Sequence, residues 1–293
     1  MLVLALDSSA TASVALARVH GSEAGASFEI LARYESEDTR SHAEVMGPYA
    51  QAVLQDAGVR GEDLDAILTG TGPGPFTGLR AGIVTARALG FAWSVPVYGM
   101  MSLTALAERA VSGAVAGEAG GDTARDTPGD TAGEENVERA FAFAEGAELV
   151  EDAELVEDAE LLVLSDARRR EVYSARYRVN AEGYSLVDGP NVCPASEILP
   201  GEGPSYAYGY GAGLYAETLE EHGWTIVDSA REVHPHAEYL VAAAARLGVE
   251  NLSEDTSAQY LRDSDAKVPA AMLARQQKQA AQAAAQAAAQ KES

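Results

Sequence analysis

The first 112 residues consist of short apolar runs separated by polar turns, and their spacing alternates between that of strands and that of helices. Continuous apolar runs indicate buried strands, whereas apolar residues repeating every three or four positions indicate helices. The pattern predicts strands over 2–6, 12–19, 27–35, 64–69 and 95–98, and helices over 41–57, 77–92 and 102–112. Strands alternating with helices are typical of an α/β lobe built on one sheet.

A second series with the same opening pattern follows after residue 160. It predicts strands over 161–166 and 171–179, then helices over 212–222 and 236–248. Asp166 ends an apolar strand as Asp7 does, and in both places a second strand returns after a short turn. This internal repeat indicates a duplicated fold with two lobes.

The two turns differ in composition. Asp7 is followed by small residues and sits at the end of a buried strand, where ligands gather in open α/β sheets. The turn after Asp166 holds three arginines, Arg168–Arg170, and no glycine, so it cannot present a cradle of backbone amides. We expect either an exposed polar turn or a grip on a partner's carboxylate or on an RNA phosphate.

A loop rich in glycine and proline joins the strand at 64–69 to the helix at 77–92. Thr77 is a candidate N-cap of that helix, and free amides at a helix N-terminus can hold an anion. No Gly-Lys-Ser/Thr follows, so the loop is not a P-loop, and a tight crossover is the alternative. The structural residues that we assign to the loop are Gly72, Pro73, Gly74, Phe76, Thr77 and Gly78.

Two stretches of biased composition set the boundaries of the domains. Residues 113–160 hold fifteen Asp or Glu and two Arg, a local charge of −13 in a chain of net charge −24. Such a composition buries too little apolar surface to order itself, so we expect disorder from residue 113 to about 146. The repeated Ala-Glu-Leu-Val-Glu-Asp at 147–152 and 153–158 is expected to form a frayed helix. The predicted order is a first lobe over 1–112 completed by the helix at 236–248, an acidic insert over 113–158, a second lobe over 159–235, an extension over 249–268 and an Ala/Gln-rich tail over 269–293.

Composition also narrows the classes of function. No apolar run reaches the roughly 20 residues of a membrane span, and the run 2–6 is too short for a signal peptide. Cys193 is the single cysteine, which fits a reducing cytoplasm and a structural thiol. The acidic balance argues against the chain holding nucleic acid unaided.

Four motifs together resemble the TsaB (YeaZ) family, which takes part in forming threonylcarbamoyladenosine in tRNA. The resemblance runs from Met1 to about Lys267, apart from the insert. The motifs are Leu4-Ala-Leu-Asp7-Ser-Ser, Gly72-Pro-Gly-Pro-Phe-Thr-Gly-Leu-Arg80, Asp166-Ala-Arg with Glu171-Val-Tyr173, and Tyr260-Leu-Arg262.

The resemblance implies a duplicated actin-like ATPase (ribonuclease H-like) fold without catalysis of its own. It implies a catalytic partner, TsaD, an ATPase, TsaE, and tRNA bound only through the complex, in the cytoplasm and away from membranes. The two metal-binding histidines of TsaD correspond here to Gly99 and Leu103, so we expect no metal or cofactor in this chain, with ATP and metal on the partners. Asp7 and Ser8 remain as candidates for a vestigial phosphate hairpin.

Partner contacts are then expected on the helices at 41–57 and 77–92, through which the family pairs with itself or with TsaD. Both helices carry more apolar positions than one narrow stripe requires, although ordinary packing on the sheet is the alternative. The residues that we assign to a partner interface are His42, Val45, Met46, Tyr49, Val53, Ile83, Ala86 and Arg87.

The remaining candidates point to no second site. His234 and His236 flank Pro235 without an evident third metal ligand, and Gly209–Gly213 is either a turn before a helix or an adenosine contact. An ATP-dependent small-molecule kinase of the same superfamily is the alternative function, and it requires Asp7 and a glycine-lined second hairpin. A metallopeptidase comes third, because the metal ligands are absent from the sequence.

Overall fold

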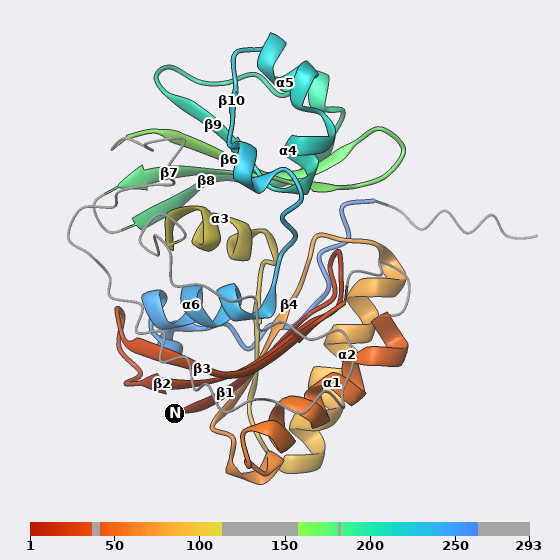
Figure 1. Ribbon diagram of the computed structural model, residues 1–293, viewed down its shortest axis with the longest axis vertical. Coiled ribbons are helices and arrows are strands. Elements are labelled where there is room, and N and C mark those ends of the chain that lie inside the picture. Colours follow the sequence, from red (N-terminus) through yellow and green to blue (C-terminus); the bar gives the residue numbers. More distant parts are fainter. Residues whose placement is uncertain (37–41, 113–157, 181–182, 263–293) are drawn as a thin grey trace, which may run out of the picture. The chain divides into compact units, whose positions relative to one another are not determined.

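The computed structural model describes residues 1–36, 42–112, 158–180 and 183–262. Three predicted segments lie outside these residues: the acidic insert over 113–158 apart from Asp158, the extension beyond Arg262, and the Ala/Gln-rich tail. Residues Met1–Leu261 form one compact unit that contains two five-stranded sheets. Figure 1 shows the two sheets with helices between them and on their outer faces.

Sheet A of the first lobe has the strand order β3-β2-β1-β4-β5. The first three strands are antiparallel neighbours, with Leu4 opposite Leu16, whereas β1–β4 and β4–β5 are parallel. Strand β1 lies in the middle and is buried on both faces, which is why its residues are apolar throughout. The strands are β1 (Leu2–Asp7), β2 (Ser13–His20), β3 (Ser27–Glu35), β4 (Ala66–Gly70) and β5 (Val97–Met100).

Helices cover both faces of sheet A. Alternate residues of β1 belong to different cores: Leu4 and Leu6 pack with α1 (His42–Asp56) and α2 (Phe76–Trp93), while Val3 and Ala5 pack with α6 (Ala237–Leu247). Helix α6 follows the whole second lobe in sequence yet contacts β1, β2, β3 and β4. The chain therefore returns to the first lobe to cover its second face.

Sheet B of the second lobe repeats this topology with the order β10-β9-β6-β7-β8. Again three strands are antiparallel neighbours, and the first of them pairs in parallel with the next strand along the chain. The predicted duplicated, two-lobed α/β fold of the actin-like type is confirmed by this match. The strands are β6 (Glu160–Asp166), β7 (Val172–Asn180), β8 (Gly183–Cys193), β9 (Ser205–Tyr208) and β10 (Thr225–Ile226).

Sheet B also has helices on both faces. Leu161 and Val163 pack with α3 (Leu103–Ser112), and the alternate residues Leu162 and Leu164 pack with α4 (Tyr210–Leu214) and α5 (Ala216–Glu221). The predicted single helix over 212–222 is thus wrong: two short helices meet at Tyr215. Four short 3₁₀ turns complete the described elements, at Gly61–Asp63, Ala195–Glu197, Asp228–Ala230 and Val249–Asn251.

A buried polar cluster joins the lobes where α3 packs against α6. Glu108 on α3 is buried, and its Oε2 accepts hydrogen bonds from Tyr184 Oη at 2.7 Å and from Arg246 Nε at 2.9 Å. The Arg246 guanidinium also lies 3.8 Å above the Tyr184 ring. These contacts satisfy a carboxylate that would otherwise be costly to bury.

Within the described residues, no helix is both long enough and apolar enough to cross a membrane.

Candidate functional site

The hairpin between β1 and β2 is buried. Asp7 and Ser8 are at most 2% exposed, and Oδ1 of Asp7 accepts hydrogen bonds from Ser9 N at 2.8 Å and Ser9 Oγ at 2.6 Å. Among the described residues, Oδ2 of Asp7 has no hydrogen-bond partner by distance and angle. Burial raises the pKa of the Asp7 carboxyl above its usual range, and the hydroxyl groups of Ser102 and Ser9 oppose that effect.

The glycine-proline loop and the start of α2 cover this hairpin. Ser8 Oγ donates to Gly78 O at 2.7 Å and accepts from Gly82 N at 2.9 Å. A Cβ on Gly74 would lie 2.4 Å from Ser9 O, which is closer than real side chains come. The loop therefore needs glycine because two backbones pack directly together, and Asp7 and Ser8, the phosphate-hairpin candidates, are used for this internal packing.

Thr77 is not the N-cap of α2, contrary to the prediction. The helix begins at Phe76, its N-cap is Pro75, and no side chain caps the first amides. Proline already has a backbone angle suited to this position, so the helix starts two residues earlier than an N-cap at Thr77 would require. Thr77 itself is exposed.

The segment after the 3₁₀ turn Val249–Asn251 lies along the first lobe and contacts α2. Gln259 N donates to Thr71 O at 2.8 Å, and Arg87 Nε donates to Thr256 Oγ1 at 2.7 Å. The ring of Tyr260 lies 4.5 Å from that of Phe76. The glycine-proline loop and the motif that begins at Tyr260 therefore meet on this side of the first lobe.

The two positions that we matched to the metal-binding histidines of TsaD take part in internal packing. Gly99 lies on β5 rather than on a helix, and a Cβ there would be 2.1 Å from Asp255 O. Leu103 is fully buried at the start of α3. Across the part of the chain that the structure describes, no three His, Cys, Asp or Glu side chains come together as a metal site would require.

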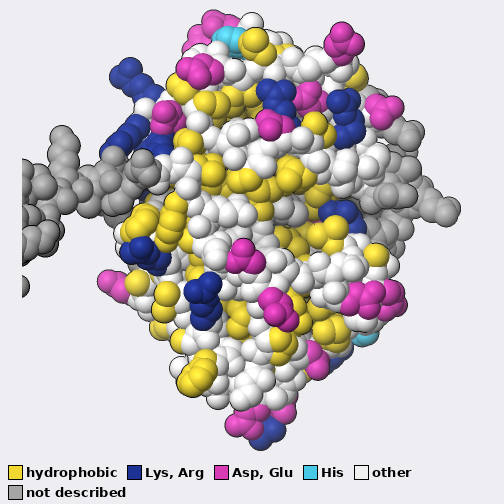
Figure 2. Space-filling model, turned by 180° about the vertical axis from the view of Figure 1, so that it is seen from behind, with side chains coloured by type: hydrophobic (Ala, Val, Ile, Leu, Met, Phe, Trp, Pro, Cys, Tyr) yellow, Lys and Arg dark blue, Asp and Glu magenta, His cyan; other side chains and the backbone are white. Residues whose placement is uncertain are grey.

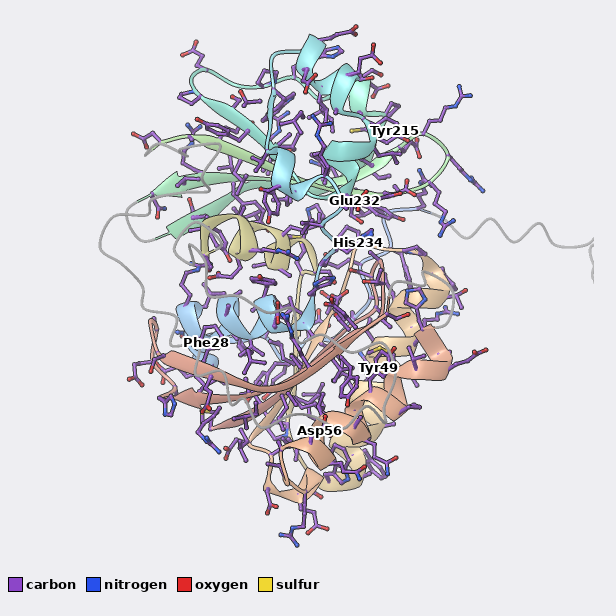
Figure 3. All side chains as sticks on the ribbon, viewed as in Figure 1. Phe28, Tyr49, Asp56, Tyr215, Glu232 and His234 are labelled. Carbon is purple, nitrogen blue, oxygen red and sulfur yellow. The ribbon has the colours of Figure 1, made fainter. Side chains whose placement is uncertain are left out.

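Most of the predicted interface residues lie inside the protomer, which corrects that assignment. Tyr49 stacks on Tyr34 with ring centroids 5.5 Å apart, between α1 and sheet A (Figure 3). The apolar positions chosen from the sequence are the stripe by which the two helices pack on the sheet. Val45 is half-buried and Arg87 is exposed, whereas six residues are buried: His42, Met46, Tyr49, Val53, Ile83 and Ala86.

A second apolar stripe of α2 faces outward, and the sequence reasoning missed it. Phe91 is 90% exposed and Val84 is 61% exposed, and Ala88 lies between them on the same face. A groove of about 510 Å³ lies between α1 and α2, and the space-filling view shows hydrophobic side chains reaching the surface around the first lobe (Figure 2). The groove is lined by Gly47, Ala50, Gln51, Leu54, Gln55, Val59, Leu89 and Trp93.

A usable signal for this stripe was present in the sequence. Positions 84, 88 and 91 repeat at helical spacing opposite the buried set 79, 83, 86 and 90. No charged residue follows Arg87 before the helix ends. When a helix is apolar on two sides and one side packs on the sheet, the other side remains exposed unless a further element or partner covers it.

The hairpin between β6 and β7 is exposed, unlike its counterpart. Arg168, Arg169 and Arg170 are all exposed and have φ angles of 59°, 58° and 65°. Oδ1 of Asp166 accepts from Arg168 N at 2.7 Å, and Glu171 N donates to Arg168 O at 3.1 Å. The turn is exposed and polar, which agrees with both expectations, and its left-handed form was not predicted from the sequence.

Three further residues singled out from the sequence, His42, His236 and Gly211, have structural contacts. His42 is buried, and its Nε2 lies 2.9 Å from Ala10 O. Burial and nearby Arg109 lower the pKa of His236 to about 3, so its 3.2 Å contact with Glu35 involves a neutral imidazole and is not an ion pair. A Cβ on Gly211 would lie 2.8 Å from Leu164 Cβ, and the glycine lets α4 pack closely on β6.

Comparison with known proteins gives a consistent set of relatives. Residues 29–118 match the family model of TsaD, tRNA N6-adenosine threonylcarbamoyltransferase. An uncharacterized protein of Mycobacterium tuberculosis is 36% identical over 200 residues, which are 68% of this chain and 68% of the relative. TsaB of Escherichia coli K12, a tRNA threonylcarbamoyladenosine biosynthesis protein, is 32% identical over 110 residues, 38% of this chain and 44% of that protein.

The structural comparison agrees with the sequence. A crystal structure from Pseudomonas aeruginosa, described as similar to peptidase YeaZ, is 26% identical and superposes with a TM-score of 0.62 over 89% of this chain and 99% of that one. A structure of YeaZ from the same organism gives a TM-score of 0.59 with the same identity and coverage. With the duplicated fold and the four sequence motifs, these matches show that the chain belongs to the TsaB (YeaZ) family.

Proposed function

We propose that this chain is a noncatalytic subunit of the complex that transfers threonylcarbamoyl to adenosine in the tRNA anticodon loop. Its role is to bind and support the catalytic subunit TsaD. TsaE joins the pair, ATP and metal belong to the partner subunits, and tRNA is bound by the complex in the cytoplasm. The kinship with TsaB of Escherichia coli supports a part in threonylcarbamoyladenosine biosynthesis.

The exposed stripe of α2 carries the proposal for the partner contact. Phe91 is 90% exposed and Val84 is 61% exposed on the same face of α2, and exposed apolar patches of this kind mark interaction sites. Large aromatic residues in the centre of an interface contribute more binding energy than most other types. The stripe is therefore the best-supported docking surface among the described residues.

The choice of TsaD as occupant rests on the region that the two families share. The match to the TsaD family model covers residues 29–118, which include both α1 and α2. A TsaD-type partner carries a related pair of helices, so two similar helix pairs can pack together face to face. A second copy of this chain offers the same pair, and self-association through this face would compete with TsaD.

The test is association of the full chain with TsaD from the same organism, measured by sedimentation velocity. Phe91→Glu places a carboxylate in the contact and should weaken binding at least about 30-fold, the equivalent of a hot spot of roughly 2 kcal/mol. The melting temperature should hardly change, because exposed substitutions cost within about 0.5 kcal/mol.

Val187→Glu is the matched control, since Val187 is 58% exposed on β8 of the second lobe. It should leave association intact. Equal loss of binding in both variants, or none in Phe91→Glu, would reject this face as the docking surface.

A further inference from the structure

The Arg168–Arg170 turn has a conformation that its residues do not favour. Three consecutive non-glycine residues have left-handed backbone angles between 58° and 65°. Side chains with a Cβ adopt this region at a cost, and glycine, asparagine or aspartate normally fills it. A strained segment that persists on the surface, where packing does not demand it, points to a functional constraint.

Neighbouring groups fix the base of the turn while its tip stays exposed. Ala167 is buried and its N–H donates to Glu171 O at 3.0 Å, which closes the hairpin. Asp166 Oδ1 holds Arg168 N at 2.7 Å. The backbone is thus held in one geometry, and three guanidinium groups are presented from a short rigid loop rather than from flexible chain.

The charge at this tip is opposite to that of the chain as a whole. The sequence has 45 acidic and 21 basic residues, and three of the basic ones stand here in succession. An exposed cationic tip on an acidic protein gives a local attraction for anions without general adhesion to polyanions. The guanidinium fork matches both phosphate and carboxylate oxygens.

A partly buried aromatic ring, Tyr215, packs against the cluster that includes Leu164 on β6 and Val172 on β7, the two strands that the turn joins. An accessible ring at this end of the sheet favours RNA over a carboxylate. Burial and Asp166 raise the pKa of the Tyr215 hydroxyl, and Arg170 is near enough to oppose them. Tyr215 is only half-buried, and Figure 3 places it on the second lobe above Glu232 and His234. Arginines next to an accessible ring are the residue types that hold single-stranded RNA, by phosphate contact and base stacking.

We infer that the Arg168–Arg170 turn is an RNA-binding element, in which the arginines contact phosphates of the tRNA held by the complex and Tyr215 offers a stacking surface. This inference rests on the proposed function for the identity of the RNA. The turn orients the RNA but does not capture it alone, because the rest of the chain is acidic.

The test compares two double variants of the full chain in complex with TsaD. Arg168→Gln/Arg170→Gln removes two charges from the turn, and Arg18→Gln/Arg60→Gln removes two exposed charges from the first lobe. Dissociation constants for unmodified substrate tRNA are measured between 50 and 200 mM salt. The turn variant should bind about tenfold more weakly, with a salt slope shallower by about 1.5, and the control should change neither.

Association with TsaD is measured on the same samples. Unchanged affinity and slope in the turn variant would overturn the inference. Loss of TsaD binding with intact folding would also overturn it, because the turn would then contact protein. If the unmutated chain does not bind TsaD, the proposed function fails. The inference about the turn is then decided by crosslinking the chain alone to the same tRNA. Loss of the crosslink in the turn variant supports the inference, and an unchanged crosslink rejects it.

Discussion

Both lobes contain a hairpin in which an aspartate ends the first strand and holds a backbone amide two residues further on. In the first lobe, Asp7 accepts from Ser9 N at 2.8 Å, and in the second, Asp166 accepts from Arg168 N at 2.7 Å. The first hairpin is buried under the glycine-proline loop and the start of α2, whereas the tip of the second is exposed and cationic. The two hairpins share one local geometry. The elements that pack over each hairpin determine whether it is buried in the core or exposed on the surface.

Removing the two aspartates should give the largest contrast between the hairpins. Asp7→Ala leaves the buried N–H and hydroxyl of Ser9 without an acceptor, and we expect a loss of about 3 kcal/mol in the free energy of unfolding. Asp166→Ala should cost about 1 kcal/mol, because water can replace its contact. Urea unfolding measures both, and equal losses would show that the hairpins are not distinguished by burial.

Crowding the first hairpin should have the next largest effect. The Cβ of Gly74→Ala would meet Ser9 O at 2.4 Å, and neither backbone can move aside freely. We expect a loss of about 2 kcal/mol, a usual cost of overpacking. A variant that melts with the wild type would mean that the loop does not seal the hairpin as described.

Acid should destabilise the protein through His236, which lies near the first-lobe residues Glu35 and Arg33. Its pKa is about 3 in the folded state and near 6.5 unfolded, so the unfolded chain binds the extra proton. This stability is complete above pH 6.5 and is lost as pH falls towards 3, by up to about 1.4 kcal/mol per pH unit. Asp7 acts in the opposite direction, because its raised pKa favours the folded state at low pH and that gain is lost as pH rises through the folded pKa.

Replacing the histidine isolates its part of the pH dependence. His236→Gln should flatten the dependence of unfolding free energy on pH between about 6 and 4. Urea titrations at a series of pH values measure the slope. An unchanged slope would contradict a buried neutral histidine, and a slope of reversed sign would indicate an ion pair with Glu35.

Relieving strain in the second hairpin should have the smallest effect. Arg168→Gly removes a Cβ at φ 59° and keeps the amide that Asp166 holds. We expect a gain of about 0.5 kcal/mol, since the relief of left-handed strain is partly offset by the greater freedom of glycine in the unfolded chain. A loss of stability would show that the arginine side chain, and not only its backbone, supports the turn.

The sequence predicted the fold well because the relevant signals are local. Apolar runs and helical spacing located the strands and helices of the first lobe, and the recurrence of Asp7 as Asp166 indicated the duplication. Strands β8, β9 and β10 were missed, because β8 is an edge strand with many exposed positions and the other two are short. Their pairing depends on neighbours that are distant in sequence.

The candidate site was harder to predict, because burial is a tertiary property. Tyr49 and Met46 were assigned to an interface, yet sheet A already covers them. Phe91 and Val84 were overlooked although they are the most exposed large apolar residues on α2. Helical periodicity identifies two apolar sides of such a helix but does not tell which side faces the sheet.

The rate at which the reconstituted complex modifies tRNA tests most directly whether this chain acts by binding TsaD and not by catalysis of its own. Asp7→Asn, assayed below its melting temperature and at saturating TsaD, should retain a rate within about twofold of the wild type, because the first hairpin is structural. Phe91→Glu should reduce the rate at least about 30-fold at limiting TsaD, in step with its loss of binding. A folded Asp7→Asn variant that binds TsaD normally but abolishes modification would contradict this role and place chemistry in the first hairpin.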